Sequence, residues 1–214
     1  RYQTSFGLNS TGSDVSLSYM VGVPDPSRLA SPQLVVIFKN LLKRDSITKE
    51  KALNEFLQLL NSGPQDEIMA LLTDNLTHYS WVQLYPKLSI DVSRQVRILS
   101  HRLQGLIGKI LGKQLAKHLK ESLGPWLCGT LDTDRQVARS ATTALELVFP
   151  AEEKRLALYK IFLPSLLEFI HNAIACETVK SLSDERFVIL QDAEAKFARV
   201  NLCCISLLGK LLPH

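Results

Sequence analysis

The chain has 214 residues, a formal net charge of +4 at pH 7, and 46% hydrophobic, 7% aromatic and 21% charged residues. This composition excludes a disordered chain, and it is less basic than that of a dedicated nucleic-acid-binding module. Charged residues interrupt the apolar runs long before the roughly 18 residues that a membrane-spanning helix needs. Leucine dominates the apolar residues, which favours an all-α fold. Because no secretory signal pattern is visible, we expect a cytoplasmic protein without a membrane span.

The first 30 residues differ in composition from the rest of the chain. They are rich in Ser, Thr, Gly, Asn and Pro and lack sustained helical periodicity. They nevertheless carry apolar side chains, including Phe6, Leu8 and Tyr19, which are too many for a purely solvated linker. We therefore predict an extended N-terminal arm over residues 1–30 that docks on the domain or on a partner through these side chains.

Helical patterns begin directly after the arm. Ser31 and Pro32 suit the N-cap and the first position of a helix, and a second helix follows residues 44–46. Residues 61–64, which include Gly and Pro, end this second helix and precede a third. We expect Pro86 to bend or break the short apolar segment that comes next.

The middle of the chain contains the clearest helix, which starts at Ser93 and keeps one apolar face for about five turns. We expect a break at residues 124–125, a Gly-Pro pair. Thr133 and Gln136 have the spacing of a capping box, and the helix that they start ends at Pro150.

Two further helical patterns complete the chain. One runs over residues 151–176, with an expected kink at Pro164, and the last runs over residues 192–212. Eight or nine helices joined by short loops could form either a globular bundle or a stacked array.

An internal repeat favours the array. The pattern D-x-x-R-Q-V starts at Asp91 and again at Asp132, 41 residues later, close to the period of about 40 to 47 residues in HEAT and armadillo repeats. We expect each aspartate to cap the helix that follows it. The sequence thus predicts a HEAT/armadillo-like helical repeat array over residues 31–214. Such arrays present extended surfaces that bind macromolecules.

No pattern of catalytic or metal-binding residues is visible. The five histidines are scattered, the four cysteines lack C-x-x-C spacing, and the motifs of phosphate-binding loops and nucleophile elbows do not occur. We therefore predict no catalytic residue, no metal site and no cofactor in this chain. A small helical enzyme is the alternative from another functional class.

Positive charge is concentrated in two segments. Residues 94–120 contain seven Lys or Arg and no Asp or Glu. At 100° per residue Arg102, Lys109 and Lys113 fall within about 40° of one helix face, where they could form a basic ridge that binds phosphate or a merely solvated face. The second group surrounds the first helix-helix corner and comprises Lys39, Lys43, Arg44, Lys49 and Lys51.

Three glycines lie close to the predicted ridge, and each costs a helix roughly 0.5 to 1 kcal/mol relative to Ala. They are Gly105, Gly108 and Gly112. Close packing against another helix is the preferred explanation, and close approach of a phosphate is the alternative.

Four stretches of the chain resemble the listerin family. Residues 42–53 contain K-x-D-x-x-T-K-x-K-A, similar to the segment that follows the arm in listerins. Residues 5–7 resemble the arm of the fungal members, residues 182–187 a late loop, and residues 194–200 the start of the helix after that loop. The middle third of the chain matches only in its helical pattern.

The resemblance implies a function that composition alone does not indicate. Listerins are RING ubiquitin-protein ligases of ribosome-associated quality control, in which a long HEAT-like solenoid joins the N-terminal domain to a C-terminal RING. The N-terminal domain is implied to anchor the ligase on stalled 60S subunits, near the sarcin-ricin loop of the rRNA, ribosomal proteins and a NEMF-family partner. Zinc and the ubiquitin-conjugating enzyme would be bound only by the RING, which ubiquitinates the stalled nascent chain.

For this chain the resemblance implies a non-catalytic, monomeric ribosome-binding domain. The candidate rRNA contacts are Lys43, Arg44, Lys49, Lys51, Arg102, Lys109 and Lys113. A generic HEAT-repeat scaffold or adaptor that binds a protein partner is the main alternative.

Overall fold

The fold was analysed in a computed structural model, which describes residues 16–19 and 22–212. The structure is 78% helical, and no β-strand occurs among the described residues, which confirms the all-α prediction. Three short non-α helices are η1 (Pro26–Arg28), η2 (Gly112–His118) and η3 (Asn172–Cys176). The α-helices are α1 (Pro32–Leu41), α2 (Ser46–Ser62), α3 (Gln65–Thr73), α4 (Asn75–Leu88), α5 (Arg94–Leu111), α6 (Leu119–Gly129), α7 (Arg135–Val148), α8 (Glu152–Ile161), α9 (Leu163–His171), α10 (Val179–Leu182) and α11 (Leu190–Leu211).

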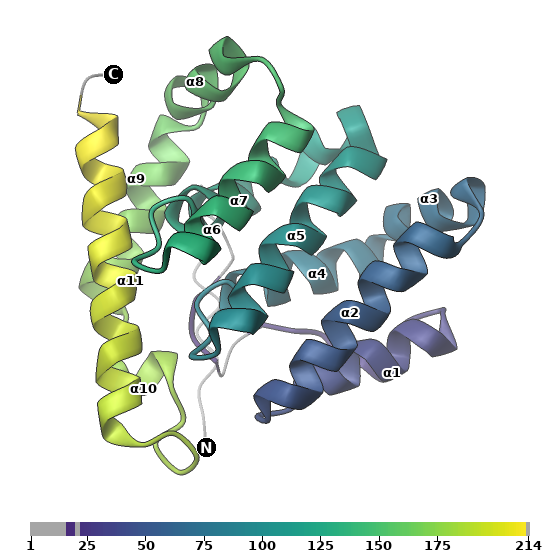
Figure 1. Cartoon of the computed structure of the whole chain (residues 1–214), viewed down its shortest axis with the longest axis horizontal. Helices are drawn as coiled ribbons and strands as arrows, with labels where there is room; N and C mark the ends of the chain where they lie inside the picture. Colours follow the sequence, from purple (N-terminus) through teal and green to yellow (C-terminus); the bar gives the residue numbers. More distant parts are fainter. Residues whose placement is uncertain (1–15, 20–21, 213–214) are drawn as a thin grey trace, which may run out of the picture.

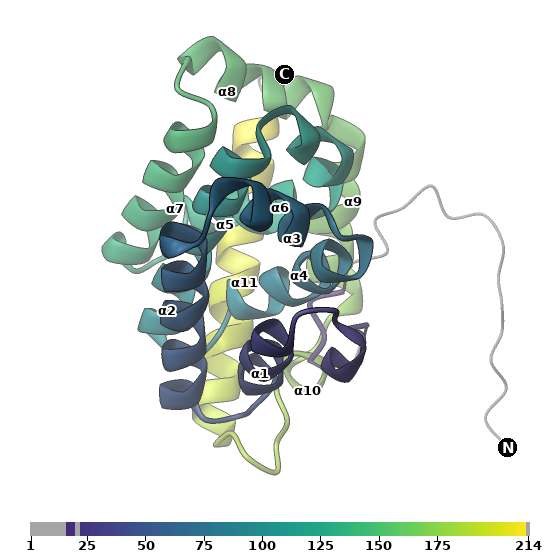
Figure 2. The ribbon, with the colours of Figure 1, turned by 90° about the vertical axis from the view of Figure 1, so that its right-hand side faces the viewer.

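The helices stack in two layers, as expected for a repeat-like array. Helices α2, α5 and α7 lie side by side and run in the same direction, and they form one layer (Figure 1). Helices α1, α4, α6 and α9 form the second layer, which the view in Figure 2 separates from the first. The long helix α11 packs against α6 and α9 at the end of the stack. Successive pairs α1/α2, α4/α5 and α6/α7 therefore bury their apolar faces against their neighbours.

Local capping decides where helices of both layers begin. Ser31 accepts a hydrogen bond from the Leu34 amide before α1, and Asp45 accepts one from the Thr48 amide before α2. The N-cap of α7 is Asp134, so the capping box predicted from Thr133 and Gln136 is wrong. Aspartate at this position accepts from two backbone amides, which leaves no capping role for the preceding threonine.

Two prolines lie inside helices and do not break them, whereas the sequence predicts a bend or break at Pro86 and a break at residues 124–125. Pro86 lies in the last turn of α4, and α6 continues through Gly124 and Pro125. A proline inside a helix costs roughly 3 kcal/mol, but both of these prolines are buried, and burial of apolar surface offsets part of this cost. Pro164, in contrast, lies in the first turn of α9, so the predicted kink is a full break between α8 and α9.

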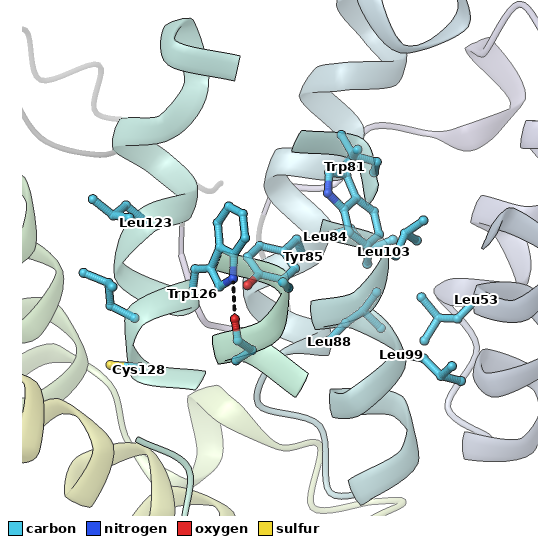
Figure 3. Close-up of a cluster of buried hydrophobic side chains, with 14 of the residues drawn as sticks. Leu53, Trp81, Leu84, Tyr85, Leu88, Leu99, Leu103, Leu123, Trp126 and Cys128 are labelled. Atoms are coloured by element: carbon cyan, nitrogen blue, oxygen red, sulfur yellow. Dashed lines mark hydrogen bonds between the residues drawn. The ribbon is translucent and has the colours of Figure 1, made fainter. Parts of the chain in front are cut away.

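The core between the layers contains many leucines and the rings of Trp81, Tyr85 and Trp126, each of which also carries a polar group. Figure 3 shows side chains of α4 and α5 next to Trp126 of α6, whose indole N–H donates to the carbonyl of Ala141 at 3.2 Å. Trp81 donates to Gln104 Oε1 at 2.7 Å. Each buried indole N–H therefore has an acceptor, so burial of the ring carries no uncompensated polar cost.

The glycines of α5 allow close approach of α7. A Cβ on Gly105 would lie 2.7 Å from Ala144 Cβ and 2.9 Å from Ala144 Cα, and one on Gly108 would lie 2.8 Å from a methyl of Val148. The helix-packing explanation is thus confirmed for these two residues. Gly112 has nothing within 4 Å and a φ of +53°, so it serves the turn that ends α5.

Candidate functional site

The repeated aspartates belong to a row of charges that links neighbouring helix pairs. The prediction that Asp91 and Asp132 cap α5 and α7 is wrong. The N-caps of these helices are Ser93 and Asp134, two residues later in each case. Each repeated aspartate instead accepts the amide of that N-cap at 2.8 Å. The second carboxylate oxygen of each aspartate faces a positively charged side chain from the preceding helix of the layer.

These positively charged side chains come from α2 and α5. Lys49 Nζ lies 2.6 Å from Asp91 Oδ2, and Arg97 Nε lies 3.0 Å from Asp132 Oδ2. Arg199 of α11 adds a contact of 4.0 Å to Asp132 and donates to the Asp91 carbonyl at 3.0 Å. The repeat in the sequence is therefore a repeat of interhelical ion pairs, and the candidate cation Lys49 is already paired inside the domain.

Three stretches on which the family resemblance rests meet at one cleft of about 350 Å³. Its walls come from residues 41–44 and 49 around the α1-α2 corner, residues 182–188, and Lys196 of α11. The arm and α4 complete the walls with residues such as Leu17 and Lys87. We call this site the basic cleft, because six basic residues line it, namely Lys43, Arg44, Lys49, Lys87, Arg186 and Lys196, against Asp91 and Asp184.

Asp184 pairs with two of these cations at the rim. Arg186 donates to its two carboxylate oxygens at 2.9 and 2.8 Å, and Arg44 lies 3.5 Å from Oδ2. Hydrogen bonds from Arg186 hold the pKa of Asp184 below its usual value. The Arg44 guanidinium also stacks 3.2 Å from the centre of the Phe187 ring. The candidate Arg44 is thus exposed but held in place by the loop before α11.

Besides the exposed Lys43, two half-buried lysines of the basic cleft make no ion pair with a described residue. Lys87 Nζ donates to the carbonyls of Ser16 at 2.6 Å and Gln83 at 3.1 Å, and Lys196 Nζ donates to the carbonyl of Leu182 at 2.7 Å. Burial lowers the pKa of each amine to about 8. These side chains were not among the predicted site residues.

The described part of the arm docks beside the cleft. Leu17 is 5% exposed and belongs to the core, whereas the Tyr19 ring is 39% exposed and lines the cleft. The backbone amide of Tyr19 donates to the Ser181 carbonyl at 3.1 Å, and Ser16 Oγ donates to Glu177 at 3.3 Å. The arm is therefore anchored here by Leu17 and by backbone contacts. The candidates Phe6 and Leu8 lie outside the described residues.

The second basic group is divided between two surface hollows. Arg102 lines a groove of about 720 Å³ between α5 and α7, while Lys109 and Lys113 line a hollow of about 400 Å³ together with Lys154. The expected ridge is incomplete, because α5 ends at Leu111 and Lys113 therefore lies beyond the helix that carries Arg102 and Lys109. Since α2 and α5 run in parallel, the hollow lies at the opposite end of the layer from the α1-α2 corner (Figure 1).

Five of the seven candidate cations are exposed and make no ion pair within the described part of the chain. They are Lys43, Lys51, Arg102, Lys109 and Lys113. Their charges are thus available to an anionic partner, in contrast to those of Arg44 and Lys49.

Outside the basic cleft, the described histidines, cysteines and carboxylates do not form a metal-binding group. Among the described residues, no three His, Cys, Asp or Glu side chains are grouped so that they could hold a metal ion. The rings of His78 and His118 stack with centroids 4.0 Å apart, and burial lowers the pKa of His78 to about 4. Cys128 and Cys204 are buried free thiols with sulfurs 3.8 Å apart. None of the described helices combines the length and apolarity needed to cross a bilayer.

The chain is similar along nearly its whole length to proteins of one kind. A family model described as E3 ubiquitin-protein ligase listerin, N-terminal domain, matches residues 27–214. E3 ubiquitin-protein ligase listerin of Neurospora crassa is 41% identical over 209 residues, which are 97% of this chain and 12% of that protein. The protein of the same name from Saccharomyces cerevisiae is 34% identical over 218 residues, which are 100% of this chain and 14% of that protein. The one from Gallus gallus is 31% identical over 208 residues, 96% of this chain and 11% of that protein.

Proposed function

The chain belongs to the listerin family of E3 ubiquitin-protein ligases as their N-terminal domain, and from this premise we propose that it anchors such a ligase on the large ribosomal subunit. The domain itself is non-catalytic. It acts as a monomer in the cytoplasm, in ribosome-associated quality control. Ubiquitin transfer to the stalled nascent chain, the zinc of the RING and the ubiquitin-conjugating enzyme belong to a part of the ligase outside this chain.

The observation that carries the proposal is the set of exposed cations that form no ion pair with any residue the structure describes. Lys43 and Lys51 lie near the start of α2, and Lys109 and Lys113 lie at the opposite end of the layer. Cations that are already paired within a fold must lose that partner before they can bind phosphate, whereas these need only lose water. Two separated patches suit a large, rigid anionic surface such as folded rRNA better than a short peptide. The neighbourhood of the sarcin-ricin loop, with ribosomal proteins and a NEMF-family partner beside it, is the proposed location.

Co-sedimentation with purified large subunits tests the proposal. We compare Lys43→Glu/Lys51→Glu and Lys109→Glu/Lys113→Glu, each in the complete 214-residue chain, at about 50 and about 200 mM salt. Attachment to duplex nucleic acid weakens with a log-log slope of roughly 0.9 per neutralised phosphate, and rRNA contacts should have the same sign. We expect each variant to bind more weakly and to show a shallower salt dependence. Arg102→Glu is added separately, because this residue lines a different groove.

The matched control is Lys160→Glu/Lys210→Glu, which changes the net charge equally at exposed lysines on α8 and α11. Its binding should stay close to that of the unmodified chain. All variants should retain their helical circular dichroism, since exposed charges contribute little to folding. If binding of the unmodified chain were insensitive to salt, or if the control lost as much affinity as the variants, the rRNA contact would be rejected. Attachment through a protein, as in a generic HEAT-repeat adaptor, would then be the better explanation.

A further inference from the structure

The basic cleft contains two ammonium groups that form no ion pair with any side chain of the described residues. Lys87 comes from α4 and Lys196 from α11, and both amines donate only to neutral backbone carbonyls. An ammonium group that is partly removed from water without a counter-charge is destabilised, and a folded domain tolerates it only at a cost. The two amines come from separate elements, so one local helix pattern does not explain both.

The acidic groups close to these amines are engaged elsewhere. Asp91 is paired with Lys49, and Asp184 is paired with Arg44 and Arg186. Glu177 accepts hydrogen bonds from the hydroxyls of Ser16 and Ser181. The lining of the cleft therefore keeps an excess of positive charge after the internal pairs are formed.

A buried hydroxyl in the same cleft also lacks a partner. Ser183 is 3% exposed, and its Oγ has no hydrogen-bond partner among the described residues. Buried polar atoms are satisfied in the great majority of native structures, so the cleft lining is incompletely satisfied, and its two ammonium groups call for an anionic acceptor from outside.

The walls of the cleft identify the kind of molecule that would supply this acceptor. Leu17, Leu84, Leu88 and Leu182 are buried apolar side chains that line it. A phosphodiester backbone presents charge on its outside and suits exposed cations, as on the other surfaces of this domain. A cleft of about 350 Å³ with recessed amines and apolar walls instead fits one acidic side chain with apolar neighbours.

We propose that the basic cleft binds a short acidic-apolar segment of a protein partner. The carboxylate of this segment supplies the counter-charge that Lys87 and Lys196 lack, and an adjacent apolar side chain packs on Leu17 and Leu88. Apart from Lys43, which also lines the cleft, the exposed cations that are proposed to contact rRNA lie outside this site. The domain would thus engage a protein and the ribosome through different surfaces.

Binding should depend on pH with a defined sign. Lys196 is faced by Asp91 and Glu177, which favour its charged form, and by Lys49 and Arg199, which disfavour it. Glu177 is the charged group that favours the ammonium form of Lys87. Below pH 8 both amines are mostly protonated and can bind a carboxylate, whereas above it they are mostly neutral. Affinity should therefore fall between pH 7 and pH 9.

The probe is a blocked pentapeptide with glycine at each end and leucine on both sides of a central aspartate, compared with its asparagine twin. Binding to the 214-residue chain is followed by NMR of the lysine ε-methylene and leucine methyl groups. We expect the aspartate peptide to shift signals of Lys87, Lys196, Leu17 and Leu88 with a dissociation constant of about 1 mM, which corresponds to roughly 4 kcal/mol. The asparagine twin should bind at least about fivefold more weakly, and raising the pH from 7 to 9 should weaken the aspartate peptide similarly.

Variants distinguish this site from other lysines. Lys196→Met and Lys87→Met should each abolish the preference for aspartate, while Lys180→Met, an exposed control outside the cleft, should not change it. The pH series on the unmodified chain tests the proposal even if a variant folds poorly. Equal binding of the two peptides, or pH-independent binding, would overturn it. An oligouridylate that shifts the same signals more strongly than the aspartate peptide would also overturn it, in favour of an RNA site.

Discussion

Replacing Gly105 by alanine should destabilise the domain, although alanine is the better helix former. Helix propensity alone would stabilise α5 by roughly 1 kcal/mol. The added Cβ, however, would lie 2.7 Å from Ala144 Cβ and 2.9 Å from Ala144 Cα, and ordinary contacts start at 3.4 Å. Because a backbone atom cannot rotate away, α5 and α7 must separate by several tenths of an ångström along their contact. Overpacking of this kind costs about 1 to 3 kcal/mol, and we expect the upper end here.

The net expectation is a loss of about 2 kcal/mol in the free energy of unfolding, measured by urea denaturation followed by circular dichroism. Gly209→Ala is the matched control, since a Cβ there has nothing within 4 Å and the residue also lies in a helix. It should leave stability unchanged or raise it by up to about 1 kcal/mol. If Gly105→Ala were as stable as the unmodified chain, close backbone contact would not be the reason for this glycine.

Three further substitutions test other parts of the structure. Arg97→Met should lower the free energy of unfolding by about 3 kcal/mol, because it leaves the buried carboxylate of Asp132 without its 3.0 Å partner, and a loss below about 1 kcal/mol in urea denaturation would contradict this. Burial lowers the pKa of His101 to about 3, so its contribution is fully present above pH 6.5 and is lost as the pH falls toward 3. Between pH 7 and pH 5 the free energy of unfolding of the unmodified chain should therefore fall by about 2 kcal/mol more than that of His101→Asn. Parallel pH profiles of the two proteins would show that His101 is not the group responsible. Leu17→Ala should destabilise the domain by about 2 kcal/mol and speed proteolysis of the arm, because Leu17 is buried. Tyr19→Ala should change the free energy of unfolding by less than about 0.5 kcal/mol, because its ring is largely exposed. A larger loss from Tyr19→Ala than from Leu17→Ala would mean that the tyrosine ring anchors the arm.

Local signals predicted the fold wherever a few neighbouring residues decide the structure. Ser31 begins α1 as expected from its hydroxyl and the following proline. Neither Pro86 nor Pro125 breaks its helix, although a break was one of the two outcomes expected at Pro86 and the outcome expected at residues 124–125, and both prolines are buried in the fold. A local rule gives the cost of a proline in a helix, but it does not contain the burial that offsets this cost.

Long-range contacts also explain the mixed result for the site. The concentration of Lys and Arg in the sequence correctly predicted exposed cations such as Lys109, because a lysine on a helix is usually exposed to solvent. It could not show that Lys49 is paired with Asp91, since that contact joins two repeats. Lys87 and Lys196 lie far apart in the chain and gave no common pattern, so only the folded structure brings them to one cleft.

The row of interhelical ion pairs has a consequence for how the domain opens. Each pair joins one helical repeat to the next, as Arg97 of α5 does with Asp132 before α7, and Arg199 of α11 reaches both repeated aspartates. In many repeat proteins the end units fray independently, because each contacts only its neighbours through apolar surface. Here, detachment of one helix pair would leave a carboxylate or a guanidinium buried and unpaired in the pair that remains. Partial opening is thereby penalised, and unfolding becomes more cooperative across the stack than apolar contacts alone would make it.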